Sequence, residues 1–403
     1  MPESPLRIAF VVQRYGLEVN GGAELSCRWV AEHLQHHAEV HVLTTCAQDY
    51  ALWENVYSPG IETLNGVCVH RFSVDSPRDP RQFSRVSTSV LTRQHSYLDE
   101  IHWMSIQGPL STSLLKAIER QRDHFDVFIF FTYLYATTFY GIQLVPCKSI
   151  LVPTAHDEPT LYLSLFRSVF HLPQFILYLT HAERRLVQSV FRNEAIPSMV
   201  VGTGINVPDI VDPGDFRARH NIDGQFILYI GRLDDSKNLD ELLEYYCRYK
   251  QSAYDEVKLV LLGKGPRTIP RRPDILPLGF VSEAEKFNAL AASSLLVLPS
   301  RYESLSMVLL EAWHMGKPVL VNGSCEVLRE QCTNSNGGLF YANYDEFATA
   351  LRLLLGDANL RDRLGRKGGE YVRLRYDWEV VEKKYLLALA RYLSKQPDGD
   401  RVF

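Results

Sequence analysis

Two loops in the second half of the chain carry charges suited to a phosphorylated substrate. The first runs from Gly231 to Asn238, directly before a predicted helix, and it contains Arg232 and Lys237. A guanidinium and an ammonium group in one short loop can both reach the oxygens of a diphosphate. The alternative is a solvated turn with ordinary surface charges, and this loop taken alone leaves both interpretations open.

The second loop, Pro299–Ser306, leads into another predicted helix and brings two carboxylates with it. Glu303 lies before this helix, and Glu311 lies about two turns inside it. The first amides of a helix form an anion site, and the two carboxylates could contact a bound sugar and a ribose. The alternative is a helix whose acidic residues stabilise its positive end without any ligand.

Glycine pairs mark two further loops. Gly263 and Gly265 follow a predicted strand and allow close backbone approach, but the pattern lacks the third glycine of a dinucleotide-binding fingerprint. Gly21 and Gly22 precede the first predicted helix and leave room for a bulky ligand near backbone amides. A flexible surface turn is the alternative for this second pair.

His156 is a candidate catalytic residue in the first half of the chain. It follows a predicted strand and stands beside Asp157 and Glu158. A single histidine is more often a packed or surface residue, but a strand-end loop with neighbouring carboxylates favours a functional role. No metal-ligand spacing accompanies it, so no metal is predicted at this position.

Short apolar runs, typical of buried parallel strands, alternate with stretches of helical periodicity and would position these loops. The predicted strands cover residues 6–12, 39–44, 125–131, 149–152, 175–179, 198–201, 226–230, 258–262, 295–298 and 318–321. The predicted helices cover residues 23–34, 238–249, 282–292, 307–314 and 378–394. This alternation predicts parallel sheets covered by helices, with ligands beyond the carboxyl ends of the strands.

The alternation occurs twice, so the sequence predicts two domains. A chain of 403 residues exceeds one ordinary core. The Gly- and Pro-rich segment 202–214 interrupts the pattern and is the predicted boundary and hinge. Residues 76–107 are polar and irregular, and we expect loops and short helices there that face an acceptor. The apolar region 160–180 is interpreted as a helix followed by a buried strand.

The composition excludes several classes of protein. The net charge of −4 argues against a nucleic-acid binder, which depends on a basic surface. The seven cysteines are scattered without a CxxC pair, so neither a disulfide framework nor a zinc site is expected, and a reducing cytoplasm fits best. We expect no signal peptide, and since no apolar run reaches about 18 residues, we expect no transmembrane helix. Peripheral contact with a membrane stays open as an alternative.

Together these segments resemble glycosyltransferase family 4, whose members are retaining enzymes with the GT-B fold. Glu303 to Glu311, with the following Gly316-Lys317-Pro318, is similar to the E-x7-E element of that family. The other matching segments are Gly21-Gly22-Ala23-Glu24, His156-Asp157, Gly231-Arg232-Leu233 with Lys237, and Tyr376-Asp377-Trp378. The resemblance extends over the whole chain and is clearest between residues 202 and 323.

The resemblance implies an α/β fold of the GT-B type, in which two doubly wound Rossmann-like domains face a central cleft. Residues 1–203 would form the N-terminal, acceptor-side domain. Residues 204–377 would form the C-terminal domain, which binds the nucleotide-sugar donor. A C-terminal helix, residues 378–396, would return to the first domain.

The resemblance also implies a role for each candidate residue. Arg232 and Lys237 would bind the donor diphosphate in place of a metal. Glu303 would hold sugar hydroxyls, and Glu311 would hold the ribose. His156 would contact the sugar or the transition state. The remaining donor-binding positions would be Gly21, Gly22, Gly231, Gly263, Gly265, Val281, Ser304, Leu305 and Ser306.

Two departures from the family pattern concern the donor loops. Ser306 stands where glycine is frequent, so its amide is retained but the fit is tighter. Gly323-Ser324-Cys325-Glu326 replaces the usual Gly-Gly-x-x-Glu, which leaves the contact of this loop with the sugar open.

The implied function is a hexosyltransferase-like reaction, which moves a sugar from a UDP- or GDP-sugar to a glycan or lipid-linked saccharide with retained configuration. We expect a role in bacterial cell-surface polysaccharide synthesis, in the cytoplasm or at the inner face of its membrane, with no cofactor, no metal and no nucleic acid. One alternative is a nucleotide-sugar epimerase or hydrolase of the same fold, which would consume the donor without an acceptor. The other is a non-catalytic scaffold that only binds nucleotide sugar, and the combination of Arg232, Lys237, Glu303 and Glu311 argues against it.

Overall fold

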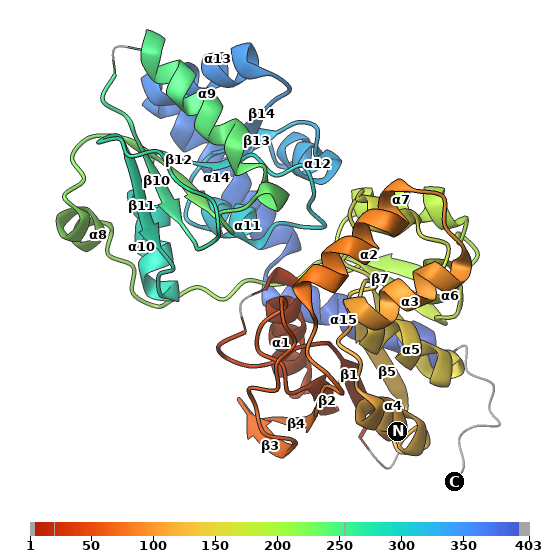
Figure 1. Ribbon diagram of the computed structural model, residues 1–403. Coiled ribbons are helices and arrows are strands. Elements are labelled where there is room, and N and C mark those ends of the chain that lie inside the picture. Colours follow the sequence, from red (N-terminus) through yellow and green to blue (C-terminus); the bar gives the residue numbers. More distant parts are fainter. Residues whose placement is uncertain (1–4, 20, 254, 395–403) are drawn as a thin grey trace. The chain divides into compact units, whose positions relative to one another are not determined.

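The computed structural model describes residues 5–19, 21–253 and 255–394, which fall into two compact units (Figure 1). The N-terminal unit comprises the described residues up to Gly204 together with those from Val381. The C-terminal unit comprises Ile205–Val380. Residues 395 and 396, in which the predicted C-terminal helix ends, lie outside the described part of the chain.

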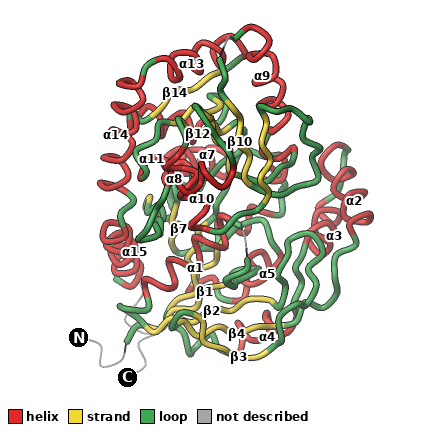
Figure 2. Tube along the Cα trace, turned by 90° about the vertical axis from the view of Figure 1, so that its left-hand side faces the viewer, coloured by secondary structure: helices red, strands yellow, loops and turns green. Residues whose placement is uncertain are grey.

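The N-terminal unit contains an eight-stranded sheet in the order β3-β4-β2-β1-β5-β6-β7-β8. Its strands are β1 (Arg7–Val11), β2 (Glu39–Thr45), β3 (Gly60–Leu64), β4 (Val67–Phe72), β5 (Val127–Phe131), β6 (Ser149–Val152), β7 (Phe175–Tyr178) and β8 (Ser198–Val200). β3 runs antiparallel to β4, and the other neighbouring strands run parallel. Figure 2 shows β1, β2, β4 and β3 side by side.

Helices and two short 3-10 turns, η1 (Pro146–Lys148) and η2 (Pro159–Tyr162), connect these strands. The helices are α1 (Gly22–Leu34), α2 (Pro80–Thr92), α3 (Tyr97–Gln107), α4 (Thr112–Arg120), α5 (Ala136–Leu144), α6 (Phe166–His171), α7 (His181–Phe191) and α15 (Trp378–Leu393), whose residues from Val381 belong to this unit. α15 is attached to α1 by His33, whose Nδ1 lies 2.6 Å from Oε1 of Glu382.

The irregular region 76–107 forms two helices, α2 and α3, that pack together. Asp79 accepts hydrogen bonds from the first amides of α2, and Ser96 forms a capping box with Asp99 at the start of α3. These caps explain why a polar stretch is helical, because they satisfy amides that have no partner within the helix.

The apolar stretch 160–170 is part of the core of the N-terminal unit. Leu161, Phe166, Val169 and Phe170 are fully buried in one hydrophobic cluster with the β5 and β6 side chains. Tyr162 is exposed at its edge. Since the core covers these apolar side chains, they offer no surface to a membrane. Within the described residues, no helix combines the length and the hydropathy that a membrane span requires.

The C-terminal unit contains a six-stranded parallel sheet in the order β11-β10-β9-β12-β13-β14. Its strands are β9 (Phe226–Ile230), β10 (Lys258–Leu262), β11 (Ile275–Gly279), β12 (Leu295–Leu298), β13 (Val319–Asn322) and β14 (Gly338–Tyr341). Its helices are α8 (Pro213–His220), α9 (Leu239–Ser252), α10 (Glu283–Ala292), α11 (Met307–His314), α12 (Glu326–Ser335), α13 (Tyr344–Gly356) and α14 (Ala358–Arg375), with the 3-10 turn η3 (Asp235–Lys237) before α9. α9 and α13 lie side by side over one hydrophobic cluster (Figures 1 and 2).

In each sheet the chain returns, after a first set of strands, to the other side of its first strand. In the C-terminal unit the chain runs from β9 outward to β10 and β11 and then returns to the other side of β9 with β12. In the N-terminal unit the same reversal lies between β1 and β5. Ligands of doubly wound sheets bind beyond the carboxyl ends of the strands at such points, so the loops after β9 and β12 are the expected site in the C-terminal unit.

Candidate functional site

The loops after β9 and β12 bring together the first two predicted charges. β9 and β12 are neighbours in the sheet, and Nζ of Lys237 lies 2.6 Å from Oε1 of Glu303. Both side chains are largely shielded, with exposed fractions of 26% for Lys237 and 12% for Glu303. An ammonium group with three donors and one carboxylate partner can still bind a phosphate oxygen, and its partial burial strengthens such a contact.

Arg232 lies in the same loop, with its guanidinium at the surface. Its Nη2 donates to Oγ of Ser236 at 2.7 Å, and its Nε lies 3.5 Å from Oδ2 of Asp234. The hydroxyl of Tyr229 donates to the backbone carbonyl of Arg232 at 2.6 Å and fixes the backbone of the loop. The exposed guanidinium can therefore contact an anion in addition to these neighbours, while the hydrogen bond from Tyr229 fixes the backbone that carries it.

The glycines after β10 shape the Arg232 loop. A Cβ atom at Gly263 would lie 1.8 Å from the carbonyl oxygen of Gly231, and one at Gly265 would lie 2.1 Å from that of Leu233. Gly263 also has a φ of +143°, which favours glycine. The backbone amide of Leu233 donates to the carbonyl of Lys264 at 3.0 Å. These glycines therefore let two backbone loops pack against each other, a close approach between parts of the chain itself.

The loop between β12 and α11 is held at both ends. Nδ2 of Asn238 donates to the carbonyl of Pro299 at 3.1 Å, and Nε2 of Gln331 donates to the carbonyl of Leu305 at 2.5 Å. Ser306 is the N-cap of α11 and has a φ of +70°. The first amides of α11 thus begin at a loop whose backbone is fixed by the N-cap residue of α9 and by a side chain from α12. Ser304 in this loop and Val281 after β11 are both partly buried.

We predict that Ser306→Gly raises the free energy of unfolding. A residue other than glycine in a sparsely populated backbone region lowers the stability of the folded state by about 1–3 kcal/mol. In addition, the buried Oγ of Ser306 has no hydrogen-bond partner among the described residues. Glycine removes both costs but loses about 0.5–1 kcal/mol in backbone entropy, so the net gain should be about 1 kcal/mol. Ser304→Gly is the matched control, since the φ of Ser304 is not positive, and it should lower stability. Urea titrations measure the free energy of unfolding of both variants. An equal loss of stability in the two would contradict the prediction.

Glu311 lies in the core, in contact with a lysine that the sequence analysis did not identify. Oε1 of Glu311 accepts from Nζ of Lys286 at 2.8 Å, and Lys286 also contacts Glu283 at 2.8 Å. Burial raises the pKa of Glu311, and the contact with Lys286 only partly offsets this rise. For Lys286, burial lowers the pKa, but the two neighbouring carboxylates outweigh burial, so the pKa of Lys286 is raised. Glu311 is 1% exposed, and its Oε2 has no hydrogen-bond partner among the described residues. This oxygen is an acceptor that remains available inside the unit.

In the N-terminal unit, His156 belongs to a group of side chains after β5 and β6. Its Nδ1 lies 3.3 Å from Oε1 of Glu158, which also accepts from the hydroxyl of Tyr133 at 3.0 Å. Burial alone would raise the pKa of Glu158, but contacts with His156, Tyr133 and Thr160 bring it below its usual value. Tyr133, buried after β5, is a member of this group that sequence reasoning missed. The sequence signal for Tyr133 was its position just after β5, the strand beside β1 at the reversal point.

Glu183, at the start of α7, fixes the loop that carries His156. Its two carboxylate oxygens accept from the backbone amides of Ala155 at 2.7 Å and Leu179 at 2.6 Å. Burial raises the pKa of Glu183 to about 8, although the two amides lower it. Thr154, before Ala155, has a φ of +50° and donates through Oγ1 to Thr132, which has a φ of +69°. The backbone before His156 is thus held in an uncommon conformation by buried polar contacts.

We predict that Glu183→Gln flattens the pH dependence of stability. In the folded chain the carboxyl group retains its proton to a higher pH than its usual 4.5, so the folded state binds more protons than the unfolded state between these pKa values. Stability of the wild type should therefore fall by about 1.4 kcal/mol per pH unit from this group as the pH rises from about 5 to 8. Urea titrations across this range should show a smaller slope in Glu183→Gln and no change in Glu54→Gln, at an exposed position. Equal slopes in all three proteins would refute the assignment.

The glycine loop after β1 surrounds a buried ion pair. Glu24 Oε1 accepts from Nη2 of Arg14 at 2.5 Å and from Nε2 of Gln13 at 2.7 Å. A Cβ atom at Gly21 would lie 2.2 Å from Oε2 of Glu24, whereas one at Gly22 would meet nothing within 4 Å. Gly21 thus makes room for the Glu24 carboxylate, and Gly22 faces open space at the N-terminus of α1.

Comparison with known proteins gives a match over the C-terminal unit and a likeness over nearly the whole chain. Residues 214–371 match the family model of glycosyl transferases group 1. An uncharacterized glycosyltransferase of Methanocaldococcus jannaschii is 23% identical over 406 aligned positions, which cover 94% of this chain and 96% of that protein. These matches support the glycosyltransferase superfamily to which that model belongs.

Solved structures share the fold. Sucrose-phosphate synthase of Thermosynechococcus elongatus aligns with a TM-score of 0.69 at 16% identity and covers 97% of this chain and all 100% of its own. The Anabaena protein HepE, solved with UDP and glucose, aligns with a TM-score of 0.70 at 14% identity and covers 96% and 100%. The expected GT-B fold class, with two Rossmann-like α/β units, is confirmed.

Proposed function

We propose that the chain is a retaining glycosyltransferase that moves a sugar from a nucleoside-diphosphate sugar to a glycan or lipid-linked saccharide. The proposal places it among the hexosyltransferase-like enzymes of family 4, in the cytoplasm and in cell-surface polysaccharide synthesis. The group 1 match over residues 214–371 and the named relative support the coarser part of this proposal, a glycosyltransferase, and the finer parts rest on the sequence resemblance. The structural neighbour solved with UDP and glucose supports a nucleotide sugar as donor, and we keep the UDP- or GDP-sugar of the sequence prediction as the proposed class.

The observation that carries the proposal is the contact of Lys237 with Glu303 where strand addition reverses between β9 and β12. This is the position at which a doubly wound sheet binds its ligand. Arg232, in the same loop, and the first amides of α11 add positive charge there. In our proposal these groups meet the charge of the donor diphosphate without a metal ion or a cofactor.

The proposed chemistry is breakage of the bond between the sugar and the diphosphate. Negative charge develops on the leaving phosphate oxygen as this bond breaks, and preorganised donors at that oxygen lower the barrier. Lys237 would follow this charge because its ammonium group can contact a phosphate and keep Glu303 as a partner. Glu303, held by Lys237, would orient the sugar hydroxyls.

Two further residues, one in each unit, are proposed to take part in the reaction. Oε2 of Glu311 would accept a hydrogen bond from a ribose hydroxyl, and Lys286 would hold the other oxygen of that carboxylate. His156, held by Glu158 and by the Glu183-anchored loop, would contact the sugar or the transition state. The remaining donor-binding positions stay predictions of the sequence resemblance.

The experiment for this proposal is an assay of nucleoside diphosphate release from UDP- and GDP-sugars, with and without a mixture of bacterial glycan and lipid-linked acceptors. We expect one donor to be consumed faster when acceptor is present, and NMR spectra of the product should show the anomeric configuration of the donor. Fast release that does not depend on acceptor would indicate a hydrolase instead. Binding without any release would favour a scaffold.

A further inference from the structure

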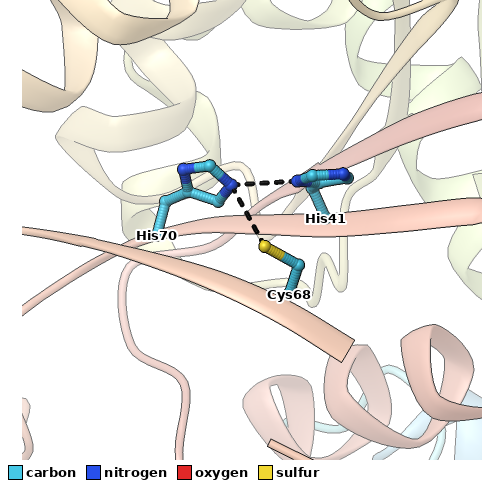
Figure 3. Close-up of side chains that lie close together, drawn as sticks. All are labelled: His41, Cys68 and His70. Atoms are coloured by element: carbon cyan, nitrogen blue, oxygen red, sulfur yellow. Dashed lines mark hydrogen bonds between the residues drawn. The ribbon is translucent and has the colours of Figure 1, made fainter. Parts of the chain in front are cut away.

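A second cluster of chemically active side chains lies in the N-terminal unit, on the strands β2 and β4. His41 belongs to β2, and Cys68 and His70 belong to β4. In the parallel register His41 lies opposite Cys68, and residues two apart on a strand project to the same face. The three side chains therefore converge on one face of the sheet, as Figure 3 shows. Because His41 is near the beginning of β2, the cluster lies toward the amino ends of the strands, whereas the His156 loop follows the carboxyl end of β6.

The donor atoms of this cluster are close enough to share one ion. Nδ1 of His41 lies 2.9 Å from Nε2 of His70, and Sγ of Cys68 lies 3.5 Å from the same nitrogen (Figure 3). All three atoms lie within 4.8 Å of one another. Tetrahedral zinc, with bonds of about 2.0–2.3 Å, keeps its donor atoms about 3.3–3.6 Å apart. A rotation that separates the two rings by about half an ångström would produce this geometry.

The side chains around His41 favour its role as a metal ligand. Its other ring nitrogen, Nε2, lies 3.0 Å from Oε1 of Glu39. A proton on Nε2 that is donated to this carboxylate leaves a lone pair on Nδ1, directed at His70 and Cys68. Carboxylates that accept from the distal nitrogen of a histidine are the common outer partners of metal ligands. The ring of Phe125, with its centroid 5.2 Å from that of His41, covers the ring from the edge.

The ligands must be accessible and deprotonated for a metal to bind, so the Cys68 thiol loses its proton to water when it binds an ion. All three side chains are partly exposed, so a solvated ion can reach them.

We propose that His41 Nδ1, Cys68 Sγ and His70 Nε2 form a zinc site, with water as the fourth ligand. Two imidazoles and one thiolate are donors that zinc prefers over magnesium or calcium. On binding, the sulfur–hydrogen bond of Cys68 breaks, its proton goes to water, and a zinc–thiolate bond forms. The ion would join β2 to β4 and stabilise that side of the sheet, because it binds the folded state and not the separated strands. None of the three ligands is among the residues proposed for sugar transfer.

The test uses the full chain without an affinity tag, stripped with a chelator that is then removed. Titration with Co²⁺ should produce the near-ultraviolet band of cobalt–thiolate charge transfer, with about one ion per chain, and Zn²⁺ should displace it. Zn²⁺ should also raise the unfolding temperature. Cys68→Ser should abolish the band and weaken Zn²⁺ binding by roughly 100-fold or more, since loss of even an outer partner costs about 10- to 100-fold. Cys147→Ser, at an exposed cysteine, is the control and should bind as the wild type does.

Either of two results would overturn the inference. One is the absence of both the cobalt–thiolate band and the stabilisation by Zn²⁺ in the wild-type chain. This result can be interpreted without any variant. The other is a band of equal strength in Cys68→Ser and the wild type. Donor binding and sugar transfer by Cys68→Ser should remain at the wild-type level, so the outcome does not depend on the proposed function.

Discussion

Lys237→Ala is expected to lower the rate of sugar transfer by about a hundred- to a thousandfold, which corresponds to about 2.7–4 kcal/mol. The ammonium group of Lys237 lies 2.6 Å from Glu303 at the reversal point of the sheet, where the leaving phosphate is proposed to bind. Because the charge on that phosphate grows in the transition state, kcat should fall more than the KM for donor rises. The affinity for the free nucleoside diphosphate should also fall. Steady-state kinetics and calorimetry measure these quantities.

The control for this variant is Lys258→Ala. Lys258 begins β10, so it lies at the amino end of a neighbouring strand, away from the proposed diphosphate position. Its removal changes the net charge equally and should leave transfer near the wild-type rate. Equal losses in the two variants would mean that only the net charge matters, and near-normal turnover in Lys237→Ala would contradict the assigned site.

Glu303→Ala is expected to reduce kcat/KM for the nucleotide sugar by roughly 10- to 150-fold, because a hydrogen bond to a charged group is worth about 1.5–3 kcal/mol. The affinity for the free nucleoside diphosphate should stay the same or increase, since the variant releases Lys237 from its carboxylate partner. This opposite response separates the two residues: Lys237 contacts the diphosphate, and Glu303 contacts the sugar. The two affinities can be measured side by side by calorimetry.

Glu256→Ala provides the matched control, because Glu256 is exposed just before β10. It should change neither quantity. If Glu303→Ala weakened the nucleoside diphosphate and the nucleotide sugar equally, Glu303 would act through the diphosphate and its proposed contact with the sugar would be wrong.

Much of the fold could be predicted because parallel strands are continuous buried runs. The predicted strands 149–152, 226–230, 258–262 and 295–298 coincide with β6, β9, β10 and β12, in which nearly every residue is buried. These four strands also carry the proposed loops. The order of strands follows once the sheets are known, and the reversal points then indicate which loops meet.

β3 and β11 lack this pattern, and sequence reasoning missed both strands. β3 is mostly exposed and pairs antiparallel with β4, and its signal was the Asn65-Gly66 turn, where both residues have positive φ. β11 contains Pro277 and lies at the edge of its sheet, where proline is tolerated. Edge strands bury little, so the apolar periodicity that identifies a strand is absent from them.

Sequence reasoning found candidate site residues in loops that follow a strand, and it missed their partners from other segments. Arg232, Lys237, Glu303 and His156 all lie in segments that follow strands. Lys286 lies inside α10, and Glu183 lies inside the first turn of α7, where an acidic residue is common without function. Their contacts exist only after distant segments pack. The contacts of His41, Cys68 and His70 also form only after packing, because no local sequence spacing predicts ligands that come from two different strands.

The central claim is that the C-terminal unit binds a nucleoside diphosphate at the loops after β9 and β12 without a metal. The most direct measurement is calorimetric titration of the wild type and Lys237→Ala with UDP, GDP, ADP, CMP and dTDP, each in the presence and absence of EDTA. We predict that one nucleoside diphosphate binds the wild type with the same affinity in both conditions, and that Lys237→Ala binds it clearly more weakly. Binding that disappears with EDTA, or no binding of any of these nucleotides to the wild type, would contradict the account.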